Sequence, residues 1–454
     1  MKDKVLIFFD TDIVVRAFYQ SDTFSILEKN FQVEYVFPVD KSSEKKYLDI
    51  NFDIFANKKI HFVNIKRNRM GMWYHLFIAQ LLFYHRGKST YKATLETKVK
   101  MELTPKLVFL MRFLSKRGIF PIFKYWFRKI LGNSKELAMF LEKEKPLCVI
   151  YPSVLTGPFI CELPREANKL NIKSIVCMNS WDNPMSKAIP NDYPDYLIVW
   201  GEDSKKQSVD LLGIPAKTIR KFGAAQFQIY KHKSSLTKTM LRQKFNVPND
   251  KRIILYAGVG ESEVETKILN LLENAIEKNF LEDTHIIYRP HPWRGKLRGS
   301  ESNFFEMQFK NITMDPHMKD YYLNAIFNEN RKFFMIDYSI TRDLLELVEG
   351  VVSPRSTVLL EAAILGKIPF VIFPEDNENI IFSKENIHFE NFCKLNDVIT
   401  CFSWADFDTK IRVFSRNLNN PIISENLKKD VNYIVDLKGV SYGERLNSLV
   451  KNII

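Results

Sequence analysis

Short apolar runs that alternate with helix-like segments are the feature that most limits what this chain of 454 residues can fold into. In the N-terminal half, strand-like runs occupy 4–9, 32–39, 59–65, 148–153, 174–180 and 196–201. In the C-terminal half, they occupy 253–258, 284–292, 332–337, 350–356 and 368–373. Strands separated by helices are typical of βαβ units, in which helices cover both faces of a parallel sheet. The sequence therefore predicts an α/β protein built from doubly wound sheets.

A change of composition separates the two halves. Residues 228–252 are polar, basic and poor in large aliphatic side chains, and a new strand–loop–helix unit starts directly after them. We expect an N-terminal Rossmann-like domain over 1–230, a second Rossmann-like domain over 240–425 and a helical tail over 426–454. Because open α/β sheets bind ligands beyond the carboxyl ends of their strands, we expect the ligand in a central cleft that both domains face.

The amino-acid composition limits the kinds of molecule that this chain is expected to bind. The net charge of +13 and the pI of about 9.2 favour anionic partners such as nucleotides, phosphates or an acidic membrane face. No nucleic-acid-binding module accompanies this charge, so we expect no nucleic-acid partner. The five cysteines form no C-x-x-C pair, which argues against a structural zinc site or a disulfide framework. Together with a first segment that resembles a β-strand more than a signal peptide, this predicts a cytoplasmic protein.

The segment 98–131 breaks the α/β alternation. Nine Lys and Arg residues lie there among Leu, Phe, Ile and Trp, and Glu102 is its one acid. Basic and aromatic residues on helices suit an anionic membrane interface, which would place the protein peripherally at the inner face of the cytoplasmic membrane. A helical insertion that packs its aromatic rings inward and leaves its lysines solvated fits the pattern as well. We predict a helical insertion in the first domain and leave these two interpretations open.

Three strands of the second domain end in clusters that suit a phosphorylated ligand. The clusters are Gly258, Gly260 and Glu261; Arg289, His291 and Arg294; and Ser353, Arg355, Ser356 and Thr357. Arginine presents a fixed fork of donors to phosphate oxygens, and the start of a helix offers free N–H groups and a positive dipole. Glycines allow a ligand to approach closely, although this G-x-G lacks the third glycine of a dinucleotide fingerprint. We expect all three clusters to face one nucleotide diphosphate.

Two residues of these segments have alternative interpretations. Glu361 lies one turn into the helix that follows Thr357, where its carboxylate could accept hydrogen bonds from a ribose diol or be a solvated helix position. His291 could donate a hydrogen bond or shuttle a proton to the ligand, or it could be a surface histidine in a capped turn.

The first domain is expected to bind the acceptor. Trp181, Asp182 and Asn183 follow a strand and belong to a loop rich in side chains that bind hydroxyl groups, with Trp181 able to stack on a sugar ring. Asp10 and Asp12 end the first strand, and we select Asp12 as the candidate general base that deprotonates an acceptor hydroxyl. The alternative role for Asp12 is to cap the next helix.

The segments IILYAG, IIYRPHP and SPRSTVLLEAAILGKIPFVIF, in this order, resemble glycosyltransferases of the GT-B fold. The resemblance covers residues 175–375 and is nearest to bacterial surface-polysaccharide enzymes, in the superfamily of CDP-glycerol glycerophosphotransferases and UDP-GlcNAc 2-epimerases. It implies that Ser356 and Thr357 contact phosphate, that Glu361 contacts ribose, and that Arg289 and His291 contact the diphosphate or the sugar.

The function implied by this resemblance is transfer of a sugar from a nucleotide sugar to a hydroxyl of a surface glycan or of its lipid-linked precursor. Asp12 and His291 are then the predicted catalytic residues, and neither a metal ion nor a cofactor is expected. Two alternatives remain open: a nucleotide-sugar epimerase, and a catalytically inactive nucleotide- or glycan-binding subunit of a polysaccharide synthase complex.

Overall fold

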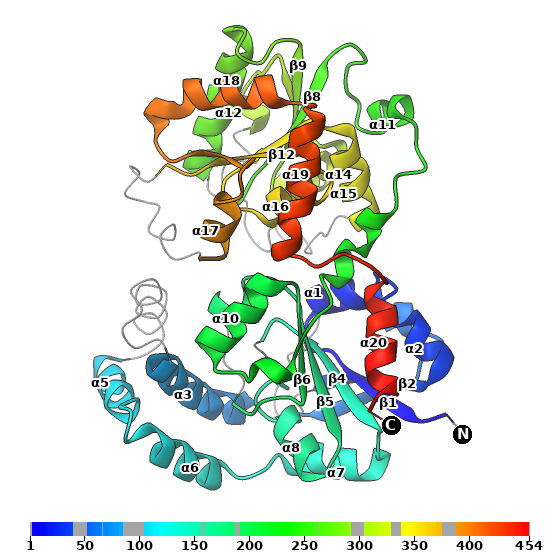
Figure 1. Cartoon of the computed structure of the whole chain (residues 1–454), viewed down its shortest axis with the longest axis vertical. Helices are drawn as coiled ribbons and strands as arrows, with labels where there is room; N and C mark the ends of the chain where they lie inside the picture. The colour runs from blue at the N-terminus through cyan, green and yellow to red at the C-terminus, as the bar shows by residue number, and fades with distance from the viewer. Residues whose placement is uncertain are drawn as a thin grey trace. The chain divides into compact units, whose positions relative to one another are not determined.

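The computed structural model describes residues 2–453, except 40–51, 66, 85–103, 156, 158, 187–190, 261, 292–303, 328–336 and 375–386. Glu261, Arg294 and most of the strand expected at 332–337 therefore lie outside the described residues. The contacts of the chain divide it into two compact domains (Figure 1). The first comprises 1–228, 384–388 and 433–454, and the second comprises 229–383 and 389–432.

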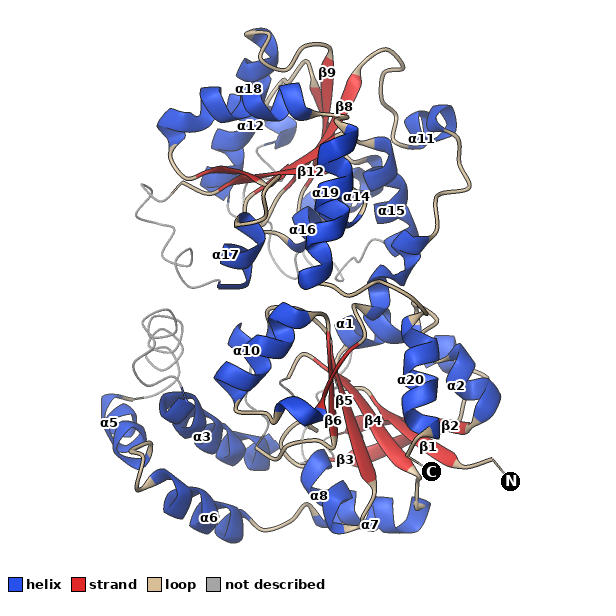
Figure 2. Cartoon of the chain, viewed as in Figure 1, coloured by secondary structure: helices blue, strands red, loops and turns tan. Residues whose placement is uncertain are grey.

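The first domain is built on a parallel sheet of seven strands in the order β3-β2-β1-β4-β5-β6-β7 (Figure 2). These strands are β1 (Lys4–Phe8), β2 (Gln32–Val39), β3 (Ile60–Asn64), β4 (Cys148–Ser153), β5 (Lys173–Met178), β6 (Tyr196–Val199) and β7 (Ile219–Lys221). The strand order reverses beside β1, which pairs with β2 on one side and with β4 on the other.

The helices of the first domain cover both faces of this sheet. They are α1 (Asp12–Val14), α2 (Ser25–Asn30), α3 (Arg67–Tyr84), α5 (Pro105–Leu114), α6 (Phe120–Leu131), α7 (Lys135–Glu144), α8 (Leu163–Lys169), α9 (Asn183–Ser186), α10 (Glu202–Leu212) and α20 (Tyr442–Lys451). Within 104–131, the predicted helical insertion thus consists of α5 and α6. Among the described residues, no helix is both long and apolar enough to cross a membrane.

Strand β1 shows why the sequence forms a doubly covered sheet. Successive side chains of a strand point to opposite faces. Val5 and Ile7 accordingly belong to one buried cluster, to which α2 and α20 contribute, whereas Leu6 and Phe8 belong to another with residues of α3, α6, α7 and α8. Both faces of β1 are buried, which explains its uninterrupted apolar run.

The second domain has a parallel sheet of six strands in the order β10-β9-β8-β11-β12-β13. These strands are β8 (Arg252–Ala257), β9 (Thr284–Arg289), β10 (Ile312–Met314), β11 (Gly350–Ser353), β12 (Ile368–Ile372) and β13 (Ile399–Cys401). Its helices are α11 (Lys238–Lys244), α12 (Ser262–Glu277), α14 (Pro316–Phe327), α15 (Tyr338–Leu347), α16 (Thr357–Ile364), most of α17 (Ile387–Cys393), α18 (Phe407–Asn417) and α19 (Pro421–Asp430). The strand order reverses beside β8, which pairs with β9 and β11.

The C-terminal residues differ from the separate helical tail expected over 426–454. Helix α19 belongs to the second domain, whereas α20 belongs to the first. A capping box starts α20, in which Ser441 Oγ accepts from the backbone N–H of Glu444 and a Glu444 carboxylate oxygen accepts from that of Ser441, at 3.2 and 2.7 Å. The helix buries Leu446 and Val450 in the first domain, and this apolar face explains why it packs there.

Candidate functional site

The candidate donor site lies at the carboxyl ends of β8, β9 and β11 in the second domain. The loops after β8 and β11 are tied together, because Ser353 Oγ donates to the carbonyl of Ala257 at 2.6 Å. The loop after β8 also meets the end of β9, where the N–H of Gly258 donates to the carbonyl of Arg289 at 2.9 Å. The predicted clusters therefore do adjoin, at the point where the strand order reverses and where open α/β sheets bind ligands.

Arg289 is a buried residue whose guanidinium is held by two hydrogen bonds in the part of the chain that the structure describes. Its Nε donates to Asp315 at 2.6 Å, and its Nη1 donates to Thr341 Oγ1 at 3.2 Å. Asp315 is fully buried and Arg289 is 8% exposed, so this ion pair fixes the plane of the guanidinium. Nη2 is also buried and has no hydrogen-bond partner among the described residues. A buried donor without a partner is costly, and an anionic ligand would satisfy it.

The helix after β11 provides a second group of donors. Ser356 holds the N-cap position of α16, but its side chain makes no capping hydrogen bond, in contrast to the usual role of serine at such a position. Thr357 is the first residue of the helix, and both side chains are partly exposed. The guanidinium of Arg355 lies 4.0 Å above the ring of Phe373, which orients it. These positions suit a phosphate at the start of α16.

Glu361 is not a solvated helix position. It is 9% exposed, and its carboxylate accepts a hydrogen bond from the phenol of Tyr230. Burial raises the pKa of the Tyr230 phenol well above its usual value, and the neighbouring Glu361 adds to the rise, whereas Arg289 opposes it. Both charged residues therefore lie near this phenol. Tyr230 escaped the sequence analysis because it lies in the polar stretch interpreted as the boundary between the domains, where no periodic pattern marks it.

The glycine turn after β8 is closed by the protein itself. The N–H groups of Val259 and Gly260 both donate to Glu265 Oε1, and Tyr288 donates to Glu265 Oε2 at 2.7 Å. A Cβ atom at Gly258 would lie 2.4 Å from Glu265 Oε2, so no larger residue fits there. Glycine is required here by the fully buried Glu265 carboxylate, a different reason from the close ligand approach that we expected. The carboxyl group of Glu265 is a site feature that the sequence did not reveal.

His291 follows β9 and is partly buried, and its carbonyl accepts a hydrogen bond from the phenol of Tyr322. That contact anchors the backbone of the turn at the strand end. The role expected for the His291 ring remains a prediction.

In the first domain, Asp10 is a carboxylate at a strand end whose pKa is strongly raised. It follows β1 where the strand order reverses and is 3% exposed. Burial raises its pKa to about 7, partly opposed by a hydrogen bond donated by the phenol of Tyr151 on β4. Its Oδ1 is buried and has no hydrogen-bond partner among the described residues. A Cβ atom at Gly157 would lie 2.0 Å from Asp10 Oδ2, so the backbone there packs directly on the carboxylate.

Asp12, the residue selected from the sequence, has a different setting. It is partly exposed and is the first residue of α1, whose N-cap is Thr11. Thr11 Oγ1 accepts from the N–H of Val14 at 3.3 Å, so Thr11 and not Asp12 caps this helix. The base role of Asp12 stays a prediction, and Asp10 is the better-placed candidate.

The expected acceptor loop is largely buried. Trp181 is 2% exposed, so its ring faces are covered by protein and a sugar has no access to stack on them in this conformation. Asn183 is 1% exposed and its Oδ1 accepts from the N–H of Ser180 at 2.9 Å, while its Nδ2 donates to Asp182 at 3.4 Å. Asn183 therefore shapes the loop, and Asp182 is the more exposed of the three residues.

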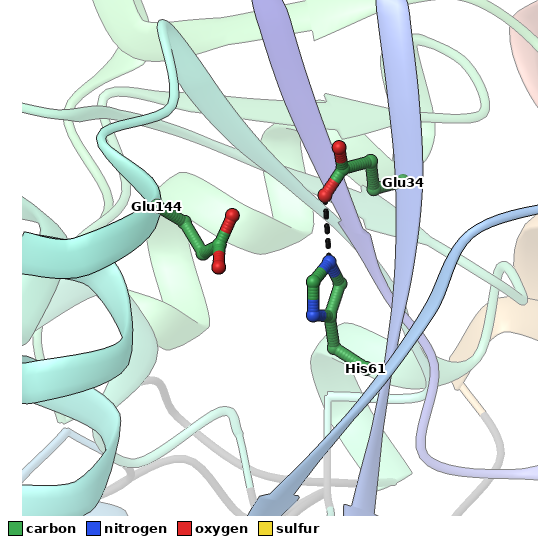
Figure 3. A group of neighbouring side chains, drawn as sticks. All are labelled: Glu34, His61 and Glu144. Atoms are coloured by element: carbon green, nitrogen blue, oxygen red, sulfur yellow. Dashed lines mark hydrogen bonds and ion pairs between the residues drawn. The ribbon is translucent and has the colours of Figure 1, made fainter.

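A group of potential metal ligands lies elsewhere in the first domain. The side chains of Glu34, His61 and Glu144 bring one ligand atom each within 4.8 Å of the others (Figure 3). His61 Nε2 lies 2.6 Å from Glu34, and the carboxylates of Glu34 and Glu144 also pair with Lys59 and Lys4, at 3.0 and 2.5 Å. The two lysines balance the charge of both carboxylates, so the three residues belong to an ion-pair network.

Solved structures of several bacterial proteins share this fold. A putative UDP-N-acetylglucosamine 2-epimerase from Listeria monocytogenes matches with a TM-score of 0.55 at 14% identity, over 100% of this chain and 96% of that one. MnaA from S. aureus, solved with UDP, matches with a TM-score of 0.51 at 12% identity, over 100% of this chain and 98% of that one. UDP-N-acetylglucosamine 2-epimerase from Rickettsia bellii matches with a TM-score of 0.51 at 13% identity, over 100% of this chain and 97% of that one.

No protein-family model and no curated protein matches the sequence. At these identities the structural matches establish the fold alone, and they confirm the two Rossmann-like domains that the sequence predicted. The chain therefore has the GT-B fold, which it shares with these solved structures.

Proposed function

We propose that this chain is an enzyme that binds a nucleotide sugar through its second domain and transfers the sugar to a hydroxyl of a surface glycan or its lipid-linked precursor. The observation that carries the proposal is Arg289, whose buried Nη2 has no hydrogen-bond partner among the described residues. Asp315 holds the guanidinium rigidly at a strand end, so its free donor is already oriented for a phosphate oxygen.

The remaining donor contacts follow from the neighbouring groups. Ser356, Thr357 and the first N–H groups of α16 bind the diphosphate together with Arg289. Glu361 accepts hydrogen bonds from the ribose, and Tyr230 fixes the position of its carboxylate. As the bond between the sugar and the diphosphate breaks, negative charge develops on the leaving nucleoside diphosphate, and Arg289 and the helix N-terminus stabilise it without a metal ion.

The acceptor hydroxyl is activated by Asp10 in this proposal. A general base is most effective when its pKa is close to the working pH, and the pKa of Asp10 is about 7. The carboxylate takes the proton of the acceptor hydroxyl while that oxygen forms the new bond to the sugar. Of the three predicted acceptor residues, Asp182 is the one that retains exposure for contact with the acceptor.

A nucleotide-sugar epimerase is the second candidate. It is favoured by the solved structures that match at a TM-score above 0.5, two of which are described as UDP-N-acetylglucosamine 2-epimerases. A base with a pKa of about 7 would serve proton abstraction from a sugar carbon as well as from a hydroxyl.

One experiment separates these functions. The purified protein is first screened by thermal shift against UDP-, GDP-, CMP-, CDP- and dTDP-linked sugars, since a ligand that binds the folded state raises the melting temperature. The stabilising compound is then followed by NMR with and without a panel of glycan and lipid-linked acceptors. Release of the nucleotide (CMP from a CMP-linked sugar, the nucleoside diphosphate from the others) that depends on the acceptor supports transfer. A change in sugar configuration without an acceptor supports epimerisation. Binding without turnover would instead indicate an inactive binding subunit.

A further inference from the structure

Helices α5 and α6 of the first domain contribute no residue to the candidate donor site. Helix α6 has two apolar faces. Phe120 and Leu131 are buried, and Phe123 and Phe127 pack partly buried against the same core cluster. A neighbouring side of the helix carries large apolar side chains that are exposed in the described part of the structure.

These uncovered side chains follow helical spacing. Ile122, Trp126 and Ile130 succeed one another every four residues on α6 and are 62%, 53% and 77% exposed. On the preceding helix α5, Phe109 is 76% exposed and Phe113 is 44% exposed. Side chains at intervals of four lie on one side of a helix, so each helix presents an apolar stripe. We call these five residues the apolar stripe.

Beside the stripe on α6 lies a cationic cavity of about 620 Å³. It is lined by Pro121, Lys124, Tyr125, Arg128 and Lys129 of α6 and by Arg165 of α8. Four of these six residues are cations. The acid that pairs with one of them is Asp192, which accepts from Arg128.

Lys124 lies close to another cation of the cavity. Burial lowers the pKa of its ammonium group and Arg128 lowers it further, whereas Asp192 opposes both effects. An anion in the cavity would relieve that repulsion. Lys129 also leans over Trp126, with its ammonium 5.2 Å from the ring centroid, so the cavity and the apolar stripe adjoin.

We propose that the cationic cavity and the apolar stripe form a docking site for an anionic phospholipid bilayer, in which the cavity takes a headgroup phosphate and the stripe enters the acyl boundary. The pairing of the two features argues for this partner. An amphipathic helix with basic and aromatic residues binds the membrane interface both by burying its apolar side chains and by attracting anionic lipids. Lys106, Lys116 and Arg117 are exposed on or next to α5 and extend the positive surface. The proposal does not depend on the activity of the donor site.

The test is sedimentation of the full chain with vesicles. Vesicles of phosphatidylglycerol and phosphatidylcholine are compared with vesicles of phosphatidylcholine alone. The variant Lys124→Gln/Lys129→Gln should bind the anionic vesicles roughly thirtyfold more weakly, since each surface cation contributes about a factor of five. The matched control, Lys206→Gln/Lys217→Gln, removes two cations from elsewhere in the same domain and should bind like the wild type.

Two further variants test the apolar stripe. Ile122→Ser/Ile130→Ser should lower vesicle binding even at high salt, because the lost contribution is hydrophobic. Trp126→Phe should keep binding but lose the blue shift of tryptophan fluorescence that vesicles cause, since the Trp126 ring is the one that enters the interface.

Three outcomes would overturn the proposal. An equal loss of vesicle binding in Lys124→Gln/Lys129→Gln and in the control would show that only the net charge of the protein matters. Binding of inorganic phosphate without vesicle binding would make the cavity a site for a free anion. Self-association that Ile122→Ser/Ile130→Ser abolishes, without vesicle binding, would assign the stripe to a second copy of the chain.

Discussion

The phenol of Tyr151 on β4 donates a hydrogen bond to the carboxylate of Asp10, which follows β1, and the order of the first sheet reverses between these two strands. Burial raises the pKa of Asp10 to about 7, and this hydrogen bond acts against the rise because it stabilises the charged form. Tyr151 therefore influences the protonation state of Asp10, the base that we propose.

Replacement of Tyr151 by Phe should shift the pH dependence of turnover. Without the donated hydrogen bond, the pKa of Asp10 should rise further, and the rising limb of the rate profile should move to higher pH. Measuring turnover against pH for the wild type and Tyr151→Phe checks this. If the rising limb of the profile stays at the same pH in Tyr151→Phe, Asp10 does not titrate in the rate-limiting step.

Asp10→Asn and Asp12→Asn distinguish the two aspartates. Both substitutions keep the shape of the side chain and remove its ability to take a proton. Loss of a general base costs about a hundredfold or more in turnover, and we expect that loss for Asp10→Asn with unchanged nucleotide affinity. Asp12→Asn serves as the control and should stay within a few-fold of the wild type. If Asp12→Asn instead lost turnover while Asp10→Asn kept it, the assignment made from the sequence would be correct.

The stability of the protein should also depend on Asp10. Its pKa is 3.8 in a model peptide and about 7 in the folded chain, so the folded state binds the proton more tightly. Its contribution to the free energy of unfolding is therefore fully present at acidic pH and is lost as pH rises from about 4 to about 7. Thermal unfolding of the wild type and Asp10→Asn across this range should show a flatter pH dependence in the variant. If the melting temperatures of the two proteins changed in parallel with pH, the raised pKa of Asp10 would be contradicted.

Glu361→Ala should weaken binding of the intact nucleotide sugar and of the nucleoside monophosphate alike, because ribose is common to both. Removing a partner of this kind costs about 1.5–3 kcal/mol, or roughly ten- to a hundredfold in affinity. Tyr230→Phe is the matched control, since it removes the buried hydrogen bond to Glu361 but retains the carboxylate. Calorimetric titration should show a smaller loss for Tyr230→Phe. Unchanged affinity in well-folded Glu361→Ala would remove the ribose assignment.

Arg289→Lys should discriminate between ligands. A lysine keeps the charge, but its single ammonium group cannot both pair with Asp315 and donate to a phosphate as the guanidinium does. The affinity for the nucleoside diphosphate should therefore fall roughly tenfold or more, whereas the affinity for the nucleoside should change little. Thr341→Val removes the neighbouring contact of Arg289 and should have a small effect on both ligands. Arg289→Ala is a poor test, because it leaves Asp315 buried and unpaired at a cost of about 3–5 kcal/mol in stability. Equal losses for nucleoside and diphosphate would argue against the phosphate contact.

Much of the fold could be predicted from the sequence because the signals that define it are local. Apolar runs of strand length, the helical segments between them and the polar stretch near 228–252 determined two doubly wound domains. The same local pattern placed Arg289, Ser353 and Ser356 at strand ends, and the structure brings those ends together. The basic and aromatic pattern of 98–131 likewise predicted helices, although it left open which side chains face outward.

Only the tertiary structure decided how the individual groups are buried and paired. Asp10 differs from Asp12 because Tyr151, 141 residues away, and the backbone at Gly157 enclose it. Glu361 is held by Tyr230, 131 residues away, and Glu265 fills the glycine turn that the sequence left open for a ligand. Desolvation and hydrogen bonding are set by residues distant in the chain, so no local pattern reveals them. The exposure of Ile122, Trp126 and Ile130 has the same origin. Helical spacing gives the stripe, but the contacts of the other apolar face of α6 with the core decide that this stripe stays exposed.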